Sequence, residues 1–353
     1  MSLFWILQGC STTAYVIEQG LGQIKILADS RPNEEVLKDP TVSDKVKAKI
    51  KDIEEYKEYF YTYFKKEKTS IYSQTTFLDG PAVTYLVVAS PFDKVEAYKK
   101  CFLFVGCFPY LGFFNQDSAL TYKKKLEKDR FVTYMRPVYA YSTLGHLEDR
   151  ILSSFFHYKT EDLADLVFHE LFHTIFFIKD EVSLNENLAS FIAEKLIKVY
   201  FKKEDDPNTK KKVQKKQKFY EEVSKLIGVL NSQYKEAFKD DSATKKKANE
   251  VLNNFLEKDF KPGLSSFCQK GDELRARKSF YCQFLKRPWN NASFLAYATY
   301  REKSGKISRL YEKLNGDIFS FVRHLEVTYK KFKKEKKRKK MKFSQYLFKD
   351  LSK

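Results

Sequence analysis

The spacing of apolar residues changes near residue 160, and the two sides of this point predict different architectures. On the N-terminal side, apolar residues three or four positions apart within 34–68 predict an amphipathic helix, and residues 118–128 predict another. Short runs rich in β-branched and aromatic residues predict the strands of a small sheet. These runs are residues 85–89, 101–108 and 131–141.

On the C-terminal side, the apolar spacing is helical almost throughout. The predicted helices are residues 161–178, 185–203, 210–238, 243–258, 291–304, 306–314 and 317–335, and the predicted breaks are Pro207, Gly263, Pro288, Gly305 and Gly316. We therefore predict an α+β fold, in which a small mixed α/β region with a short sheet is followed by a mainly helical region. The predicted boundaries are 11–155 for the mixed region and 156–329 for the helical region.

The first predicted helix of the C-terminal side carries His169-Glu170-Leu171-Phe172-His173. A separation of four residues places both histidines on one face of a helix, where their imidazoles can reach one metal ion. Glu170 is turned by about 100° from His169 and can lean over the open side of that metal. Three ionisable groups in an otherwise apolar stretch are costly to bury unless they are paired or bind a metal. The pattern is that of a zincin and predicts a Zn²⁺ site.

A catalytic zinc site needs a third protein ligand besides two imidazoles. The next predicted helix begins with Asn185-Glu186-Asn187-Leu188-Ala189 after a short polar connection. Two antiparallel helices joined in this way would return Glu186 to the side of His173, and a carboxylate is a suitable zinc ligand. The rival acidic residues are Asp180 and Glu181 in the connection, and Glu194, whose place further along suits a residue that orients a ligating histidine.

These residue types together predict metal-assisted hydrolysis of a peptide. Zinc lowers the pKa of a bound water towards about 7 and polarises a carbonyl group. Glu170 would take the proton of that water and later deliver it to the leaving amine. A donor for the oxyanion is also required. The sequence thus predicts a zinc metallopeptidase with His169, His173 and Glu186 as ligands and Glu170 as general base.

With both metal motifs in place, the chain resembles the gluzincin metallopeptidases, and more closely a bacterial family of aminopeptidases that are often lipid-anchored. The similarity extends over roughly residues 10–325. It rests on blocks at Tyr15–Leu27 (YVIEQGLGQIKIL), Val105–Phe114 (VGCFPYLGFF), Ala140–Asp149 (AYSTLGHLED), His169–His173, Asn185–Ala189 and Asn290–Tyr300 (NNASFLAYATY).

The resemblance implies zinc held by the three ligands named above, a peptide substrate and a place in the bacterial envelope. Tyr141 and Tyr300 lie in family blocks and are candidates for the oxyanion donor, although packing is the default role of a tyrosine. Aminopeptidases need an anionic clamp for the substrate's α-amine, and the Gly-x-Met-Glu-Asn segment of other gluzincin aminopeptidases has no counterpart here. Glu148 and Asp149 are the alternatives, in a segment that also has the pattern of a surface turn.

The charge of the chain changes this interpretation only at its C-terminal end. The formal charge is +19, and residues 330–342 hold ten basic residues and one acidic residue, a net +9. We interpret 330–353 as a basic tail with a solvated helix end, which can also bind anionic lipid. Phe332 is the only aromatic residue in this run, so the stacking platform of a single-strand nucleic-acid binder is absent. The rival hypothesis is a non-catalytic envelope protein that has a structural metal site and uses the tail to bind anionic lipid or nucleic acid.

The first ten residues are apolar and end in Leu7-Gln8-Gly9-Cys10, which resembles the end of a bacterial lipoprotein signal. Such a signal leaves an acylated cysteine, and Ser11 after it favours the periplasmic face of the outer membrane. No basic residue precedes Cys10, however, so an ordinary buried cysteine and a cytoplasmic location stay open. The remaining cysteines are Cys101, Cys107, Cys268 and Cys282, and they allow three disulfide connectivities.

Overall fold

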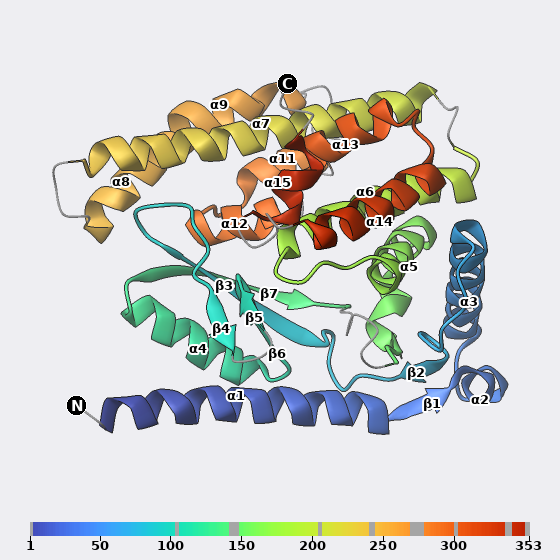
Figure 1. Ribbon diagram of the computed structural model, residues 1–353. Coiled ribbons are helices and arrows are strands. Elements are labelled where there is room, and N and C mark those ends of the chain that lie inside the picture. Colours follow the sequence, from blue (N-terminus) through green and yellow to red (C-terminus); the bar gives the residue numbers. More distant parts are fainter. Residues whose placement is uncertain are drawn as a thin grey trace. The chain divides into compact units, whose positions relative to one another are not determined.

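Helices dominate the computed structural model, and three small sheets accompany them (Figure 1). The structure describes residues 3–102, 106–140, 148–203, 207–239, 244–268, 279–299, 303–335 and 341–349. This composition confirms the predicted α+β class with a mainly helical C-terminal part. Among the described residues, no helix combines the length and the apolar character needed to span a bilayer.

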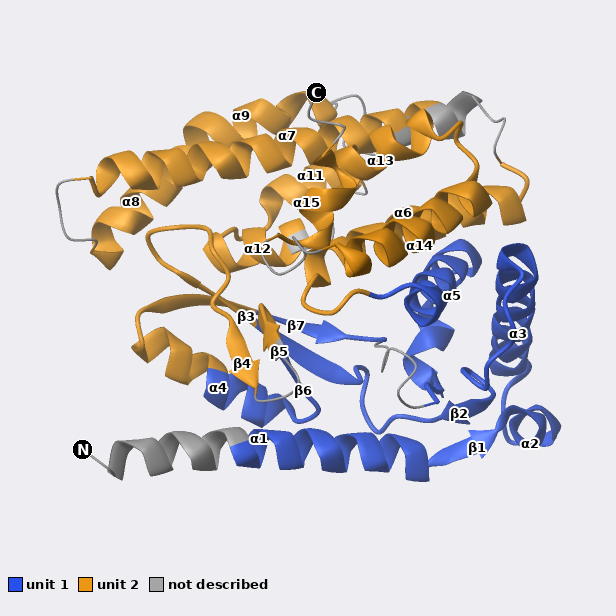
Figure 2. Ribbon diagram, in the orientation of Figure 1, with its two compact units in different colours: residues 1–87, 111–122, 135–177 blue, residues 88–110, 123–134, 178–353 orange. Residues whose placement is uncertain are grey.

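Contacts divide the chain into two units that alternate along the sequence (Figure 2). Unit 1 holds residues 1–87, 111–122 and 135–177, and unit 2 holds 88–110, 123–134 and 178–353. The elements wholly within unit 1 are α1 (Leu3–Ala28), β1 (Ser30–Pro32), α2 (Asn33–Lys38), α3 (Asp44–Phe64), β2 (Gln74–Thr76), β8 (Ile151–Leu152), the 3₁₀ turn η1 (Ser153–His157) and α5 (Thr160–Ile175).

Unit 2 is built mainly from the helices that follow α5 in the chain. Its elements are β4 (Lys100–Phe102), β5 (Gly106–Phe108), α6 (Val182–Tyr200), α7 (Pro207–Ala237), α8 (Lys245–Phe255), the π-helical turn η2 (Leu256–Phe260), α9 (Lys261–Leu264), η3 (Ser265–Phe267), α11 (Phe280–Lys286), α12 (Asn291–Thr299), α13 (Ser304–Lys313), α14 (Ile318–Lys334) and α15 (Phe343–Leu347). Four elements contribute to both units: β3 (Thr84–Pro91), β6 (Tyr110–Phe113), α4 (Gln116–Lys128) and β7 (Phe131–Val138).

Within the described ranges, the strands form two sheets of three strands and one hairpin. The first sheet has the order β1-β2-β8, with β1 antiparallel and β8 parallel to β2. The second has the order β6-β3-β7, and the hairpin pairs β4 with β5. The hairpin corrects the prediction of one strand at 101–108: Cys101 pairs with Cys107 across the ladder and is joined to it by a disulfide, so the chain reverses between them.

In unit 1, helix α3 packs against helix α5. The Ser43 hydroxyl accepts a hydrogen bond from the Val46 backbone N–H at the start of α3, and Lys65 ends the helix in the left-handed conformation. The apolar face of α3 is buried, and the ring of Phe60 stacks on Phe168 of α5 with centroids 6.3 Å apart. Burial of an aromatic side chain of this kind contributes about 1.5–3 kcal/mol to the free energy of folding, so the contact with α3 stabilises the position of α5.

In unit 2, residues of α7, η2, α11 and α12 form an aromatic core. Phe219, Phe260, Phe284 and Phe294 are all fully buried, and Trp289 stacks on Phe294 with a centroid distance of 4.8 Å. A second disulfide, Cys268–Cys282, crosses the same region. Both disulfides come from the four cysteines whose pairing the sequence left open.

Most of the predicted helices of the C-terminal part are confirmed, but not all of the predicted breaks. Pro207 is the first residue of α7, where its missing N–H costs nothing. Gly263 lies inside α9 and Gly305 inside α13, so these two predicted breaks were wrong. Gly316, with φ +69°, does end a helix: its N–H bonds the Tyr311 carbonyl at the end of α13.

Candidate metal centre

Helix α5 carries two histidines one turn apart in its second half, which is packed in the interior. Leu163, Val167 and Leu171 of this helix are fully buried. His173 is buried, His169 is half-buried, and Glu170 is also buried. The imidazoles therefore leave water and come together because the helix spacing and the apolar packing on α3 fix their positions.

The two imidazoles direct their Nε2 atoms at one another. The Nε2–Nε2 distance is 3.3 Å and the ring planes are nearly perpendicular, at 83°. Two zinc–nitrogen bonds of about 2.0–2.1 Å at a tetrahedral angle hold their nitrogens about 3.4 Å apart. The separation that α5 imposes is thus the one that two ligands of a tetrahedral metal ion require.

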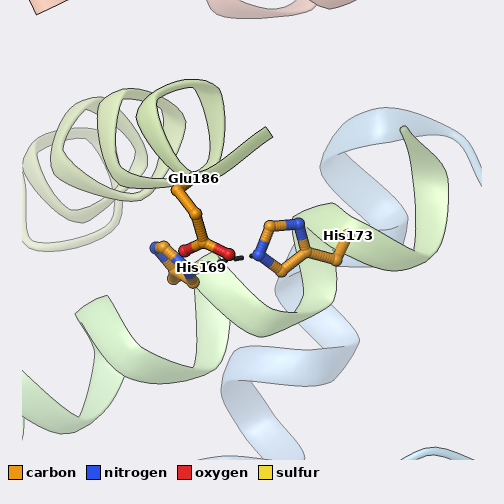
Figure 3. Close-up of side chains that lie close together, drawn as sticks. All are labelled: His169, His173 and Glu186. Carbon is orange, nitrogen blue, oxygen red and sulfur yellow. Dashed lines mark hydrogen bonds between the residues drawn. The ribbon is translucent and has the colours of Figure 1, made fainter. Parts of the chain in front are cut away.

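A carboxylate from helix α6 completes a group of three side chains that can hold a metal ion. The ligand atoms of His169, His173 and Glu186 all lie within 4.8 Å of one another (Figure 3). In Figure 3 the Glu186 carboxylate faces both imidazoles. Among the residues that the structure describes, no other group of His, Cys, Asp or Glu side chains of this kind is found.

The two asparagines that flank Glu186 fix the beginning of α6. The amide of Asn185 accepts a hydrogen bond from the Ile178 N–H (3.0 Å) and donates one to the Ile178 carbonyl (2.8 Å). The amide of Asn187 donates to the Ser183 carbonyl (2.6 Å) and accepts from the backbone N–H of Lys303 (3.0 Å). Both asparagines are buried at 1% exposure; the bonds of Asn185 are buried and those of Asn187 partly buried, so leaving them unmade would be costly.

Comparison with known protein families identifies the chain. A family model described as "putative aminopeptidase" matches residues 14–341, which is nearly the whole chain. The chain belongs to this aminopeptidase family. No curated protein and no solved structure matches it significantly.

The family match confirms the resemblance to a family of aminopeptidases, and the matched range covers both α5 and α6. The two tyrosines suggested as oxyanion donors, Tyr141 and Tyr300, lie outside the described residues. The candidate amine clamp has other contacts: Glu148 accepts hydrogen bonds from the Ser70 hydroxyl (2.6 Å) and from Arg150 (3.2 Å).

The rival acidic residues around the aminopeptidase motifs are placed elsewhere. Asp180 lies in the turn before α6 with φ +62°. The carboxylate of Glu181 accepts hydrogen bonds from the backbone N–H and the hydroxyl of Ser344. Glu194 forms ion pairs with Lys198 (3.4 Å) and Lys216 (3.0 Å). Of the four carboxylates considered as the third ligand, Glu186 is the one grouped with the histidines.

Tyr72 is a residue near Glu170 that the sequence analysis did not single out. It is 1% exposed, has φ +60°, and its hydroxyl makes no hydrogen bond with any described residue. Burial raises the pKa of the Tyr72 phenol well above its usual range, and the negative charge of Glu170 raises it further. Tyr72 therefore stays a neutral phenol beside the charge of Glu170. Among many tyrosines, the sequence held no signal that would have identified this one.

Proposed function

We propose that this member of the aminopeptidase family is a zinc metallopeptidase of the gluzincin type. The observation that carries the proposal is the pair of Nε2 atoms 3.3 Å apart on α5, grouped with the Glu186 carboxylate. Two imidazoles and one carboxylate are a common ligand set of catalytic zinc, which keeps its fourth position for water. His169, His173 and Glu186 would hold the ion.

Zinc, when bound, supplies a Lewis acid that lowers the pKa of a water towards about 7 and polarises the scissile carbonyl. The proton transfers would belong to Glu170. Its place next to His169 in the sequence and on a buried helix turn suits a base that accepts the proton of the attacking water and passes it to the leaving amine. Burial also keeps competing water away from this carboxylate.

Replacing the proposed base tests the mechanism directly. Glu170→Gln keeps the size of the side chain but cannot accept a proton, so peptide hydrolysis should fall by at least about 100-fold while bound zinc is retained. Glu161→Gln removes the same charge from an exposed position of the same helix and is the matched control. Metal analysis and mass spectrometry of the peptide products provide the measurements. Hydrolysis by Glu170→Gln at the wild-type rate would contradict the mechanism.

The same product analysis tests aminopeptidase action. Removal of single N-terminal residues is expected, whereas internal cleavage would indicate an endopeptidase. A purified protein that contains zinc but cleaves nothing in a broad peptide library would favour the rival hypothesis of a non-catalytic envelope protein with a structural metal site. Salt-sensitive binding to anionic vesicles or nucleic acid, lost on deletion of residues 330–353, would support that rival further.

We also propose that the protein acts in the bacterial envelope and is attached to a membrane through Cys10. Two observations support this location. The disulfides Cys101–Cys107 and Cys268–Cys282 are typical of oxidising compartments. In addition, Val16, Ile17, Leu21 and Ile24 of α1 are each more than half exposed and form an apolar face free of charged residues. Mass spectrometry of the native protein should find Cys10 acylated, and an intact, unmodified Met1 would contradict lipidation.

A further inference from the structure

A basic pocket lies in unit 2 between helix α13 and the short C-terminal helix α15. Its volume is about 420 Å³. Among the described residues that line it, four are lysines and none is acidic; the polar ones are Lys303, Lys306, Lys342, Ser344, Gln345 and Lys349. The lysines come from two parts of the chain that are about forty residues apart, so the fold and not a local charge run creates this concentration of positive charge.

Three of these lysines form no ion pair with the carboxylates that the structure describes. They are Lys306, Lys342 and Lys349, which are exposed at the rim. The Lys349 ammonium lies 4.3 Å from the centre of the Tyr346 ring, which holds that charge in place without cancelling it. Ammonium groups around one cavity repel one another, and an anion that enters it removes this repulsion.

Both walls of the pocket are fastened to the first turns of α6. On the α13 side, the Lys303 ammonium donates to the Ser183 hydroxyl (3.1 Å), and its backbone N–H donates to Asn187. On the α15 side, Ser344 donates its N–H (2.8 Å) and its hydroxyl (3.1 Å) to the Glu181 carboxylate. The helix turn between these anchors is the one that carries Glu186.

The pocket is therefore close to the proposed metal ligand. Ser183 and Glu186 are three residues apart, about 4.5 Å along the helix axis. The Lys303 ammonium, which bonds the Ser183 hydroxyl, therefore lies on the order of 10 Å from the Glu186 carboxylate. A peptide in extended conformation covers this distance in about three residues.

We propose that this pocket binds the carboxylate groups of acidic peptide substrates. The inference rests on the proposed peptidase function: an aminopeptidase holds one residue before the scissile bond, so the remainder of the peptide lies beyond it. An Asp or Glu two to four residues after the scissile bond, or the C-terminal carboxylate of a short peptide, would enter the pocket and contact its lysines. The pocket would then select for acidic peptides independently of the residue that is removed.

Direct peptide binding tests the pocket without relying on catalysis. The full-length wild-type protein, stripped of metal with a chelator, would be titrated with Ala-Ala-Glu-Glu and with Ala-Ala-Gln-Gln amide. The acidic peptide should bind about tenfold more tightly, because hydrogen bonds between a carboxylate and an ammonium group are stronger than those of a neutral amide, although salt screens them. The double variant Lys342→Gln/Lys349→Gln should abolish the difference. Equal binding of the two peptides by the wild type would overturn the proposal.

The matched control is Lys218→Gln/Lys246→Gln, which removes the same charge from exposed positions on α7 and α8. This control should keep the tenfold preference. If the control loses the preference too, the effect is one of general charge, and the proposed binding of carboxylates in the pocket is wrong. A second arm measures binding to vesicles of phosphatidylglycerol. If only vesicle binding, and not the peptide preference, depends on Lys342 and Lys349, the pocket is a headgroup site and the proposal is wrong.

The outcomes separate the pocket from the peptidase mechanism. Activity that persists in Glu170→Gln would end the proposed mechanism but leave the peptide preference untouched. Conversely, if the enzyme is active but has the same kcat/KM for acidic and neutral peptides, the mechanism stands and the proposed role of the pocket is wrong.

Discussion

Helices α5 and α6 supply the candidate metal ligands in two different ways. On α5, the two histidines are brought together by the helix period itself, and apolar packing on α3 holds the helix. On α6, the position of Glu186 depends on hydrogen bonds that its neighbours Asn185 and Asn187 make with other segments. One half of the site is thus fixed by local geometry and the other by tertiary polar contacts.

This difference has an energetic consequence. Apolar packing is distributed over many contacts, so the loss of one histidine leaves α5 in place. The polar contacts of α6 are few and at least partly buried, and a group that loses its last hydrogen-bond partner there costs about 1–3 kcal/mol. Substitutions on α5 should therefore affect the metal alone, and those on α6 should affect both the metal and the fold.

The largest effect is expected from a ligand on α5. His173→Ala should lower zinc affinity by more than about 100-fold, because residues that only orient a metal ligand change it by about 10- to 100-fold. The free energy of unfolding, measured in the presence of a chelator, should change by less than about 1 kcal/mol. Competition with a chromogenic chelator and urea unfolding measure the two quantities. His157→Ala, at an exposed position, is the control. Unchanged zinc affinity in His173→Ala would show that α5 does not supply a metal ligand at this position.

Asn185→Ala should give the mixed effect that distinguishes α6. Its removal leaves the N–H of Ile178 without its partner and takes from the Ile178 carbonyl one of its two donors, the other being the Glu181 N–H, so stability of the metal-free protein should fall by about 1–3 kcal/mol. Zinc affinity should fall by about 10- to 100-fold because Glu186 is no longer held. Asn254→Ala on the exposed face of α8 should change neither quantity. If Asn185→Ala loses zinc affinity but no stability, Asn185 does not act by fixing the start of α6.

The same contrast explains what the sequence could predict. The spacing of His169 and His173, like the helix at α3, is a local pattern, and the structure has both on helices as predicted. The hydrogen bond from Lys303 to Asn187 joins residues 116 positions apart, and the local sequence around either residue does not predict this contact. The strands β1, β2 and β8 have two or three residues each, too few for an alternating pattern, and were missed for that reason.

Asn187→Ala is expected to have a smaller effect on stability than Asn185→Ala. It removes the acceptor of one backbone N–H, that of Lys303, so the free energy of unfolding should decrease by about 1–2 kcal/mol. Because Lys303 also lines the basic pocket, the preference for acidic peptides should weaken along with zinc binding. Urea unfolding and the peptide titration described above measure the two effects. A stability loss equal to that of Asn185→Ala would remove the distinction between the two asparagines.

The smallest effect concerns a polar group in unit 1 that makes no hydrogen bond with the described residues. Tyr72→Phe removes a buried hydroxyl, so at pH 8 stability should stay the same or rise by up to about 1 kcal/mol. Tyr61→Phe is the matched comparison: its hydroxyl bonds Thr69 (2.9 Å) and Thr174 (3.1 Å), and its loss should cost about 1 kcal/mol.

Alkaline pH sharpens this last contrast. The pKa of Tyr72 in the folded protein lies well above the value of about 10 in the unfolded chain, so the unfolded state releases this proton first as the pH rises. The contribution of Tyr72 to stability is therefore complete below about pH 10 and is lost progressively above it. Urea unfolding at pH 8 and at pH 10.5 should show a smaller decline for Tyr72→Phe than for the wild type. An equal decline would mean that the phenol ionises in the folded protein, which its burial beside Glu170 opposes.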